Sequence, residues 1–250
     1  MLIGRLNWVV VVTFLSFLST DLFAKSLWSD NSLTYLSGKH YRVGDPKKTV
    51  LTFEHASGHS WGDVFYFVDR LKSNNGSNET YMEFSPRLSL SKVSGNEFKY
   101  GIVKDILIAS TIEMGQNETT SFDHYLLGIG FDLDMPGFRF FQWNFYHRNN
   151  DHRDNNWQLT QAWSLPFSLG EELFRYDGFI DWSSATSDVG SSVNFTSQLK
   201  WDLGQTLWQQ PHQMYLGFEY VLWRNKYGIR NSPLFDTNEN NLNLLLKLHF

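Results

Sequence analysis

Hydrophobic and polar residues alternate along most of this 250-residue chain, and the last ten residues show the pattern best. Alternate positions there are apolar: Leu242, Leu244, Leu246, Leu248 and Phe250. The positions between them are polar except for one leucine: Asn241, Asn243, Leu245, Lys247 and His249. Because successive side chains of a strand point to opposite faces, this period predicts a strand with one apolar face. A terminal Phe is typical of bacterial outer-membrane barrels, although the edge strand of a soluble sandwich would also alternate.

The same alternation recurs along the rest of the chain and predicts about twelve strands. Their expected ranges are 31–43, 48–57, 62–72, 80–91, 103–114, 122–133, 138–148, 156–165, 174–183, 194–203, 213–224 and 240–250. The polar faces carry opposite charges, as the lining of a watery lumen would, and Trp and Tyr near the strand ends suit a membrane interface. If both termini are periplasmic, the number of strands must be even, as it is here. The pattern therefore predicts an all-β fold, a transmembrane antiparallel β-barrel of about 12 strands with a narrow channel.

The first residues predict an N-terminal secretory signal peptide. Arg5 precedes a short apolar run at 8–18, and Ala24 offers a cleavage point. The run is too short for a comfortable membrane-spanning helix, which needs about 20 residues, so a retained anchor is the weaker alternative. We therefore expect a signal peptide at 1–24 and a single barrel domain at 25–250.

Composition agrees with an exported barrel. The chain has no cysteine, and 10 Trp, 11 Tyr and 21 Phe make aromatic residues 17% of it. Transmembrane barrels carry such residues in girdles at the two membrane interfaces. A net charge of -5 argues against a nucleic-acid partner. The eight His residues show no metal-ligand spacing, and no phosphate-binding loop is present, so we expect no metal and no cofactor.

Five blocks of this chain resemble the nucleoside-specific channel-forming porins of the outer membrane, the Tsx-like family, which includes related phage-receptor porins. The blocks are 49–70, 81–95, 104–115, 125–137 and 176–188. The most specific run contains Glu83, Pro86, Arg87 and Ser89, followed by Glu-Met-Gly at 113–115. The resemblance implies a twelve-stranded barrel in the Gram-negative outer membrane whose lumen binds and passes nucleosides.

A nucleoside channel needs aromatic faces for the base, and carboxylates, amides or Arg for the sugar hydroxyls. The alternating strands offer such side chains on their polar faces, and these are the candidate lumen residues: Glu54, Phe65, Phe67, Asp69, Glu83, Arg87, Asp177, Asp181, Lys200, Glu219 and Asn243. The alternative for each charged residue is a structural ion pair, such as Glu83 with Arg87, because buried charges must be paired.

Two other functions are open to this sequence. His55 and Ser57 lie two apart on one strand face, as in outer-membrane lipid hydrolases in which a His activates a Ser nucleophile. Gly58 stands where those enzymes have an Asn. The second alternative is a surface receptor barrel without selective transport, with phage as a possible partner. We expect a monomeric channel in contact with outer-membrane lipid, with nucleosides as solutes and no enzyme activity.

Overall fold

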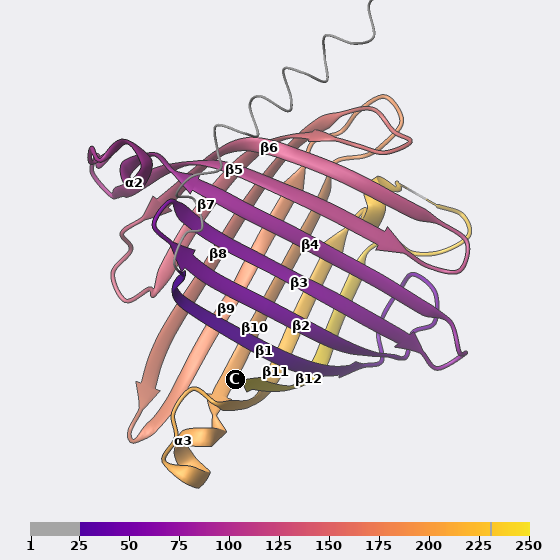
Figure 1. Cartoon of the computed structure of the whole chain (residues 1–250). Helices are drawn as coiled ribbons and strands as arrows, with labels where there is room; N and C mark the ends of the chain where they lie inside the picture. Colours follow the sequence, from indigo (N-terminus) through magenta and orange to yellow (C-terminus); the bar gives the residue numbers. More distant parts are fainter. Residues whose placement is uncertain (1–25, 231) are drawn as a thin grey trace, which may run out of the picture.

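A computed structural model describes residues 26–230 and 232–250, and they form a closed antiparallel barrel of twelve strands (Figure 1). Each strand pairs with its neighbours in the sequence, and β1 closes the barrel against β12. The strands are β1 (Ser26–Gly38), β2 (Lys48–His59), β3 (Gly62–Ser73), β4 (Asn78–Ser89), β5 (Val103–Gln116), β6 (Ser121–Leu133), β7 (Phe140–Asn149), β8 (Asn156–Leu169), β9 (Glu172–Ser183), β10 (Ser192–Asp202), β11 (Met214–Arg224) and β12 (Glu239–His249). The predicted signal peptide at 1–24 lies outside the described residues.

The predicted fold is confirmed, and the strands from β2 to β12 agree with their predicted ranges to within four residues at each end. The predicted range of the first strand is wrong by five residues at each end, because the strand spans 26–38 and not 31–43. After Gly38 the chain leaves the sheet and turns into the barrel. The His40 amide donates to Asn241 Oδ1 at 3.0 Å, and the Tyr41 hydroxyl donates to Asn243 Oδ1 at 3.0 Å. These bonds to side chains take the place of a strand ladder.

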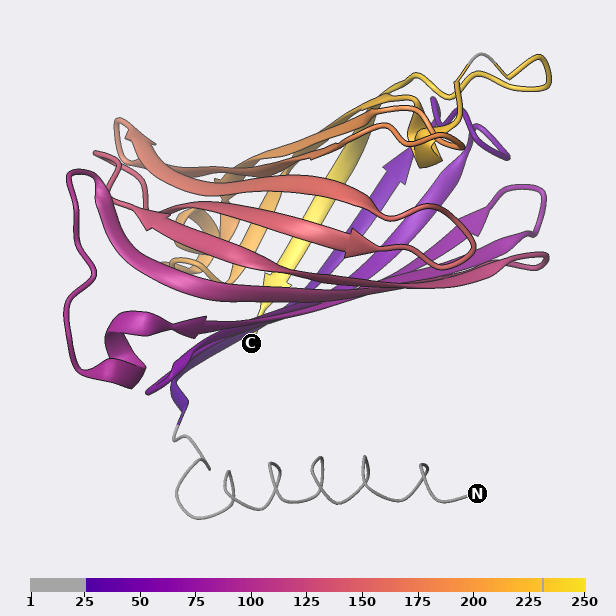
Figure 2. The same cartoon turned by 90° about the horizontal axis from the view of Figure 1, so that it is seen from above.

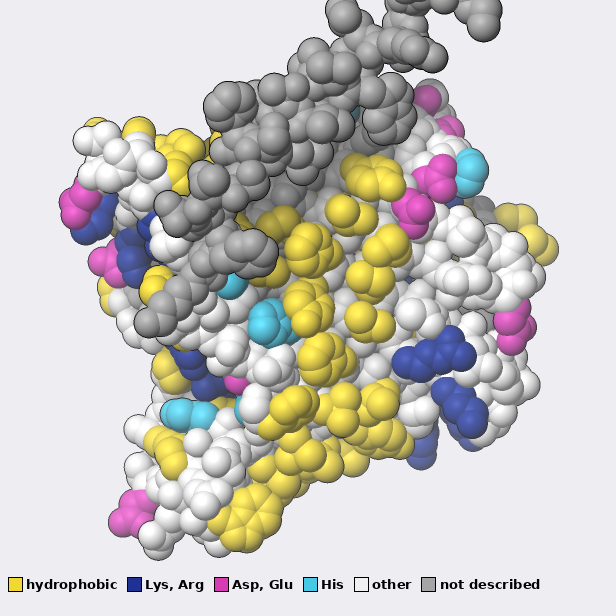
Figure 3. All heavy atoms as spheres, in the orientation of Figure 1, with side chains coloured by type: hydrophobic (Ala, Val, Ile, Leu, Met, Phe, Trp, Pro, Cys, Tyr) yellow, Lys and Arg dark blue, Asp and Glu magenta, His cyan; other side chains and the backbone are white. Residues whose placement is uncertain are grey.

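The apolar faces of the strands point outward, as the alternation predicts. On β12, Leu242, Leu244, Leu246 and Leu248 are 38–54% exposed. A belt of hydrophobic side chains covers the outer face of the sheet in Figure 3. Apolar side chains gain nothing from the interior when hydrocarbon surrounds the barrel, so the sidedness of a soluble protein is inverted.

The interior is mostly polar, with two small apolar clusters. One joins Leu36, Tyr41, Val50 and Leu245, and the other joins Ala109, Leu126 and Tyr146. Leu245, the exception in the alternation of the last strand, is fully buried in the first cluster. Its apolar side chain is needed because the inserted Tyr41 presents a ring to that wall.

Ser26 and Phe250, the first and last described residues, lie at one end of the barrel, here called the terminal end, and the opposite end is called the distal end (Figure 2). Two short helices, α2 (Leu90–Ser94) and α3 (Leu203–Trp208), lie at the terminal end. Ser89 caps α2 and Asp202 caps α3, each side chain accepting a backbone N–H of the first turn. A single-turn helix, η1 (Lys226–Gly228), lies in the last distal loop. No helix within 26–230 and 232–250 is long and apolar enough to cross a membrane.

The sidedness can be tested with two Phe-to-Arg variants. Phe218 is 52% exposed on the outer face of β11, whereas Phe65 is 38% exposed on the inner face of β3. Phe218→Arg should lower the free energy of unfolding in lipid vesicles by about 2–4 kcal/mol, because the guanidinium enters hydrocarbon. Phe65→Arg should cost much less, because its guanidinium stays in the watery lumen. Equal costs in denaturant titrations would mean that the register is wrong, since a one-residue slip exchanges the faces.

Candidate channel lumen

All eleven candidate residues lie on the inner faces of their strands. Residues directly opposite one another in a sheet share a face. One such row runs from Glu54 through Phe67 to Glu83. A second row runs from Asp177 through Gln198 and Glu219 to Asn243. The structure therefore brings the candidates onto two walls of one lumen, formed by β2–β4 and by β9–β12.

Arg87 is held by two carboxylates near the terminal end. Its Nε and Nη2 donate to the two oxygens of Asp63 at 2.9 and 2.8 Å, and its Nη1 donates to Asp132 Oδ1 at 3.0 Å. The side chain is almost fully buried, at 4% exposure. A bidentate guanidinium–carboxylate contact fixes both direction and distance. This group is therefore a rigid part of the wall.

The alternative ion pair of Glu83 with Arg87 does not form. Glu83 instead accepts a hydrogen bond from the Tyr81 hydroxyl at 2.6 Å. Four residues of extended strand separate positions 83 and 87 by about 13 Å, which is beyond the reach of the two side chains. Asp63 lies directly opposite Arg87 on β3, so the register and not the sequence spacing selects the partner.

The wall formed by β9–β12 gathers cations. Lys200 Nζ donates to Asp177 Oδ2 at 2.5 Å, and Lys247 forms an ion pair with Glu54 across the closure of the barrel. The Arg175 guanidinium lies 5.0 Å from the ring centroid of the buried Tyr215. Lys200 and Lys247 are also buried. Their ion pairs with Asp177 and Glu54 hold the two side chains in place. The predicted lumen position of Lys200 agrees with this arrangement.

The opposite wall carries a continuous run of aromatic rings, called here the aromatic track. It consists of Phe65, Phe67, Tyr81, Phe122 and His124. Ring centroids of successive members are 6.0, 5.8, 6.3 and 4.5 Å apart. The last pair is stacked and the others are tilted. The track therefore presents several ring faces and edges to a solute in the lumen.

Gly115 allows the track to cross from β4 to β6. It lies directly opposite both Tyr81 and Phe122 on the inner face of β5. A Cβ at this position would overlap the Phe122 ring, so only glycine lets that ring reach over to Tyr81. Our candidate residues include Phe65 and Phe67 but not Phe122 or His124. The sequence does carry a signal for them: the period-two pattern of β6 places Phe122 and His124 on its inner face, and Gly115 on the neighbouring strand leaves room for a ring.

Four lumen carboxylates accept hydrogen bonds from uncharged groups only. Asp69 accepts from Thr52 at 2.5 Å and Asp181 accepts from Thr160 at 2.5 Å, as Glu83 does from Tyr81. Glu219 accepts from Gln198 at 2.8 Å and from Asn243 at 3.0 Å. Within the described chain, no Lys or Arg nitrogen lies within 4.0 Å of these four carboxylates. Their remaining lone pairs are available to hydrogen-bond donors of a solute.

Tyr41 narrows the distal mouth of the lumen. It is buried at 7% exposure, and its partner Asn243 bonds in turn to Asn241 and Glu219 at 2.9 and 3.0 Å. This network joins the inserted loop to β11 and β12. Sequence analysis missed Tyr41 because the strand pattern appeared to continue to residue 43.

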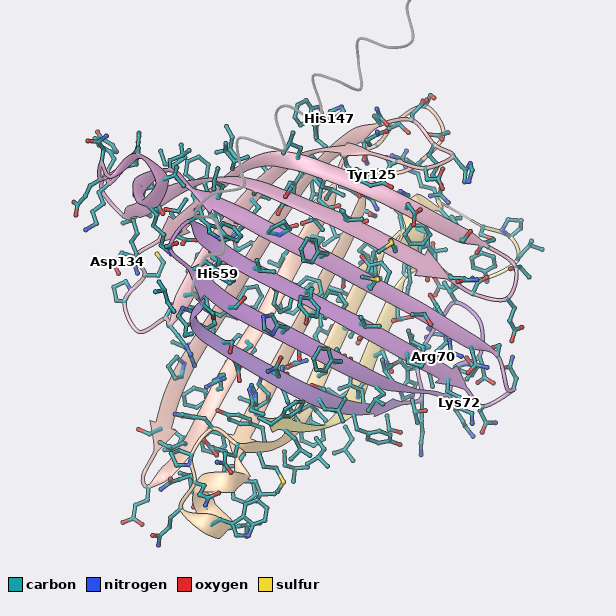
Figure 4. All side chains as sticks on the ribbon, viewed as in Figure 1. His59, Arg70, Lys72, Tyr125, Asp134 and His147 are labelled. Carbon is teal, nitrogen blue, oxygen red and sulfur yellow. The ribbon has the colours of Figure 1, made fainter. Side chains whose placement is uncertain are left out.

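The His55–Ser57 pair of the hydrolase alternative does not form. His55 and Ser57 lie on the outer face of β2, where His55 Nδ1 bonds to Asn31 Oδ1 at 2.8 Å and its ring stacks on Tyr66. Ser57 Oγ lies 3.0 Å from Nε2 of His59, a residue labelled at the terminal end in Figure 4. Among the residues placed by the structure, no group of three or more His, Cys, Asp or Glu side chains could hold a metal ion.

Comparisons with known proteins agree with this geometry. The family described as nucleoside-specific channel-forming protein, Tsx, matches residues 25–248. Outer membrane protein OmpK of Vibrio parahaemolyticus is 26% identical over 179 residues, which are 67% of this chain and 66% of that protein. The nucleoside-specific channel-forming protein Tsx of Salmonella typhimurium is 24% identical over 197 residues, 68% of this chain and 67% of that protein. The chain thus spans about two thirds of the length of these relatives.

Solved structures show the same fold. The KdgM porin superposes with a TM-score of 0.50 at 9% identity, covering 88% of this chain and 99% of the porin. The NanC porin gives a TM-score of 0.50 at 10% identity, with the same coverage. Together with the closed twelve-stranded barrel, the family match over 25–248 shows that this chain belongs to the Tsx family of channel-forming proteins and is a channel of the Gram-negative outer membrane.

Proposed function

We propose that this channel carries nucleosides, or solutes of similar size and chemistry, passively across the outer membrane. The single observation that supports the proposal best is the aromatic track beside unpaired carboxylates. Phe67 lies directly opposite Glu83, and Asp69 lies opposite Tyr81. A ring and an acid are thus neighbours at the same level of the wall.

This arrangement matches the two halves of a nucleoside. The base has a flat aromatic face that stacks on Phe or Tyr without regard to its identity. The ribose carries hydroxyl groups, which donate hydrogen bonds to carboxylates such as Asp69, Glu83 and Asp181. A row of several rings offers consecutive sites of modest affinity, and a solute must bind weakly enough at each site to leave it.

The charges of the lumen favour neutral and cationic solutes. The buried cations Arg87, Lys200 and Lys247 are each neutralised by at least one carboxylate. Asp69, Glu83, Asp181 and Glu219 have no such partner. Where these four acids are ionised, they present a negative field to an entering solute, which disfavours phosphorylated compounds.

The aromatic track can be tested by planar-bilayer recording of Phe67→Ala. Base–aromatic stacking is worth about 1–3 kcal/mol, so the concentration of adenosine that halves the ion current should rise by about 5- to 150-fold. Open-channel conductance should stay similar or increase, because a large side chain is removed from the lumen. The matched control is Phe218→Ala, which removes a Phe from the lipid-facing side and should leave adenosine block unchanged.

Comparing current block by nucleosides with block by sugars of similar size distinguishes a selective channel from a general pore. Wild-type current should respond to nucleosides at lower concentrations than to hexoses, because hexoses have no aromatic face to stack. Equal and poor block by both classes would show a general pore. In that case the Phe67→Ala variant would also leave the block unchanged.

Arg87 provides a second test through ion selectivity. Arg87→Gln leaves Asp63 and Asp132 without a counter-charge, so the reversal potential in a KCl gradient should shift toward the potassium potential. Arg87→Lys keeps the charge and should shift it much less. Arg70→Gln, a neutralisation on the outer face of β3, is the control for a change of net charge alone. An unchanged reversal potential in Arg87→Gln would show that this group lies outside the ion path.

A further inference from the structure

Two cations on the outer face of β3 lie beyond the edge of the apolar belt. Arg70 and Lys72 are exposed, and they lie directly opposite Leu51 and Thr49 on β2. Positions 64, 66 and 68 of the same face are Val, Tyr and Val. Figure 4 labels Arg70 and Lys72 toward the distal end of the strand, and Figure 3 shows blue side chains beside the yellow belt in that region. The cations therefore begin where the hydrocarbon-facing surface ends.

These cations are not neutralised by the protein. Within the part of the chain that the structure places, no carboxylate lies within 4.0 Å of either charged group. Arg70 Nη1 donates to Thr80 Oγ1 at 2.8 Å, which leaves four of its five N–H groups free for another acceptor. Lys47 is also exposed, and its carbonyl accepts from Asn74 in the adjacent turn at 3.0 Å. Arg70, Lys72 and Lys47 form what we call the rim patch.

The rim patch is a local feature. The outward positions at the distal ends of β5 to β8 carry Gln116, Asp123, His147 and Trp157, and the distal end of β11 carries a single cation, Arg224. A Lys or Arg that merely extends from hydrocarbon to water would suit any strand of the barrel. The gathering of cations on β3 and at Lys47, just before β2, instead points to a ligand with a fixed place on this sector.

We propose that the rim patch binds the phosphoryl groups of a phosphorylated glycolipid in the outer leaflet. Its acyl chains would cover the apolar belt below, near Leu51, while the phosphates accept from Arg70 and Lys72. Arg70 and Lys72 are two residues apart on one strand, so their side chains leave the backbone about 7 Å from each other. One lipid headgroup can therefore contact both. The hydroxyls of Thr49 and Thr80 lie on the same face and complement sugar oxygens. Ser26 and Phe250 lie at one end and the strand count is even, which assigns the distal end to the cell surface, where this leaflet lies.

Binding of bis-phosphorylated lipid A to the full barrel in detergent, measured by native mass spectrometry, tests the proposal. The double variant Arg70→Gln/Lys72→Gln should bind lipid A about 25-fold more weakly than wild type does, because each lost cation should lower the affinity about five-fold. The matched control is Lys104→Gln/Arg139→Gln, which removes one exposed Lys and one exposed Arg at the terminal end and should bind as wild type does. Lipid A stripped of its phosphates should bind wild type and the double variant equally weakly.

Further measurements distinguish the sources of phosphate and exclude misfolding. Wild type should bind lipid A more tightly than phosphatidylglycerol, and equal affinities with equal losses in the double variant would overturn the glycolipid assignment. Unchanged lipid A affinity in the double variant, or an equal loss in the control, would overturn the patch itself.

Heat-modifiable gel migration and adenosine block should be retained in both variants. Arg70→Lys, which keeps the charge, should retain most of the lipid A affinity.

Discussion

The structure depends on the closure of β1 against β12. In hydrocarbon no water is available to bond a free N–H or C=O group, so a sheet can cross a membrane only without edges. Seven residue pairs, from Ser32–His249 to Gly38–Asn243, join the two ends of the sheet. Lys247 and Glu54 add an ion pair across the same region. β12 therefore completes the wall of the barrel.

Closure also sets the chemistry of the interior. With the apolar faces turned to lipid, every strand contributes its polar face to one narrow space, and the charges there must find partners. Arg87 shows the result: its guanidinium is almost without exposure, and Asp63 and Asp132 accept three hydrogen bonds from it. The carboxylates of Asp69 and Asp181 have only hydroxyl donors, which leaves them open to solutes. The paired acids hold the wall together, and the unpaired acids are the ones that the proposed function uses.

The register of the strands decides which side chains meet. Tyr81 and Phe122 come from strands that are not neighbours, yet their rings approach because Gly115 stands between them. In the same way, the fully buried Leu245 accommodates the inserted ring of Tyr41. Small or apolar residues at single inner positions therefore shape the lumen as much as the charged residues do.

The sequence by itself determined the strands and their faces, because alternation with a period of two follows directly from extended backbone geometry. It also placed Phe65, Phe67 and the other candidates on the inner wall. Only the tertiary structure decided the partners: Arg87 binds Asp63 and not Glu83, because partners lie across strands and not along them. The inward turn after Gly38 was likewise hidden, since the bonds of residues 40 and 41 go to side chains some 200 residues later, at 241 and 243.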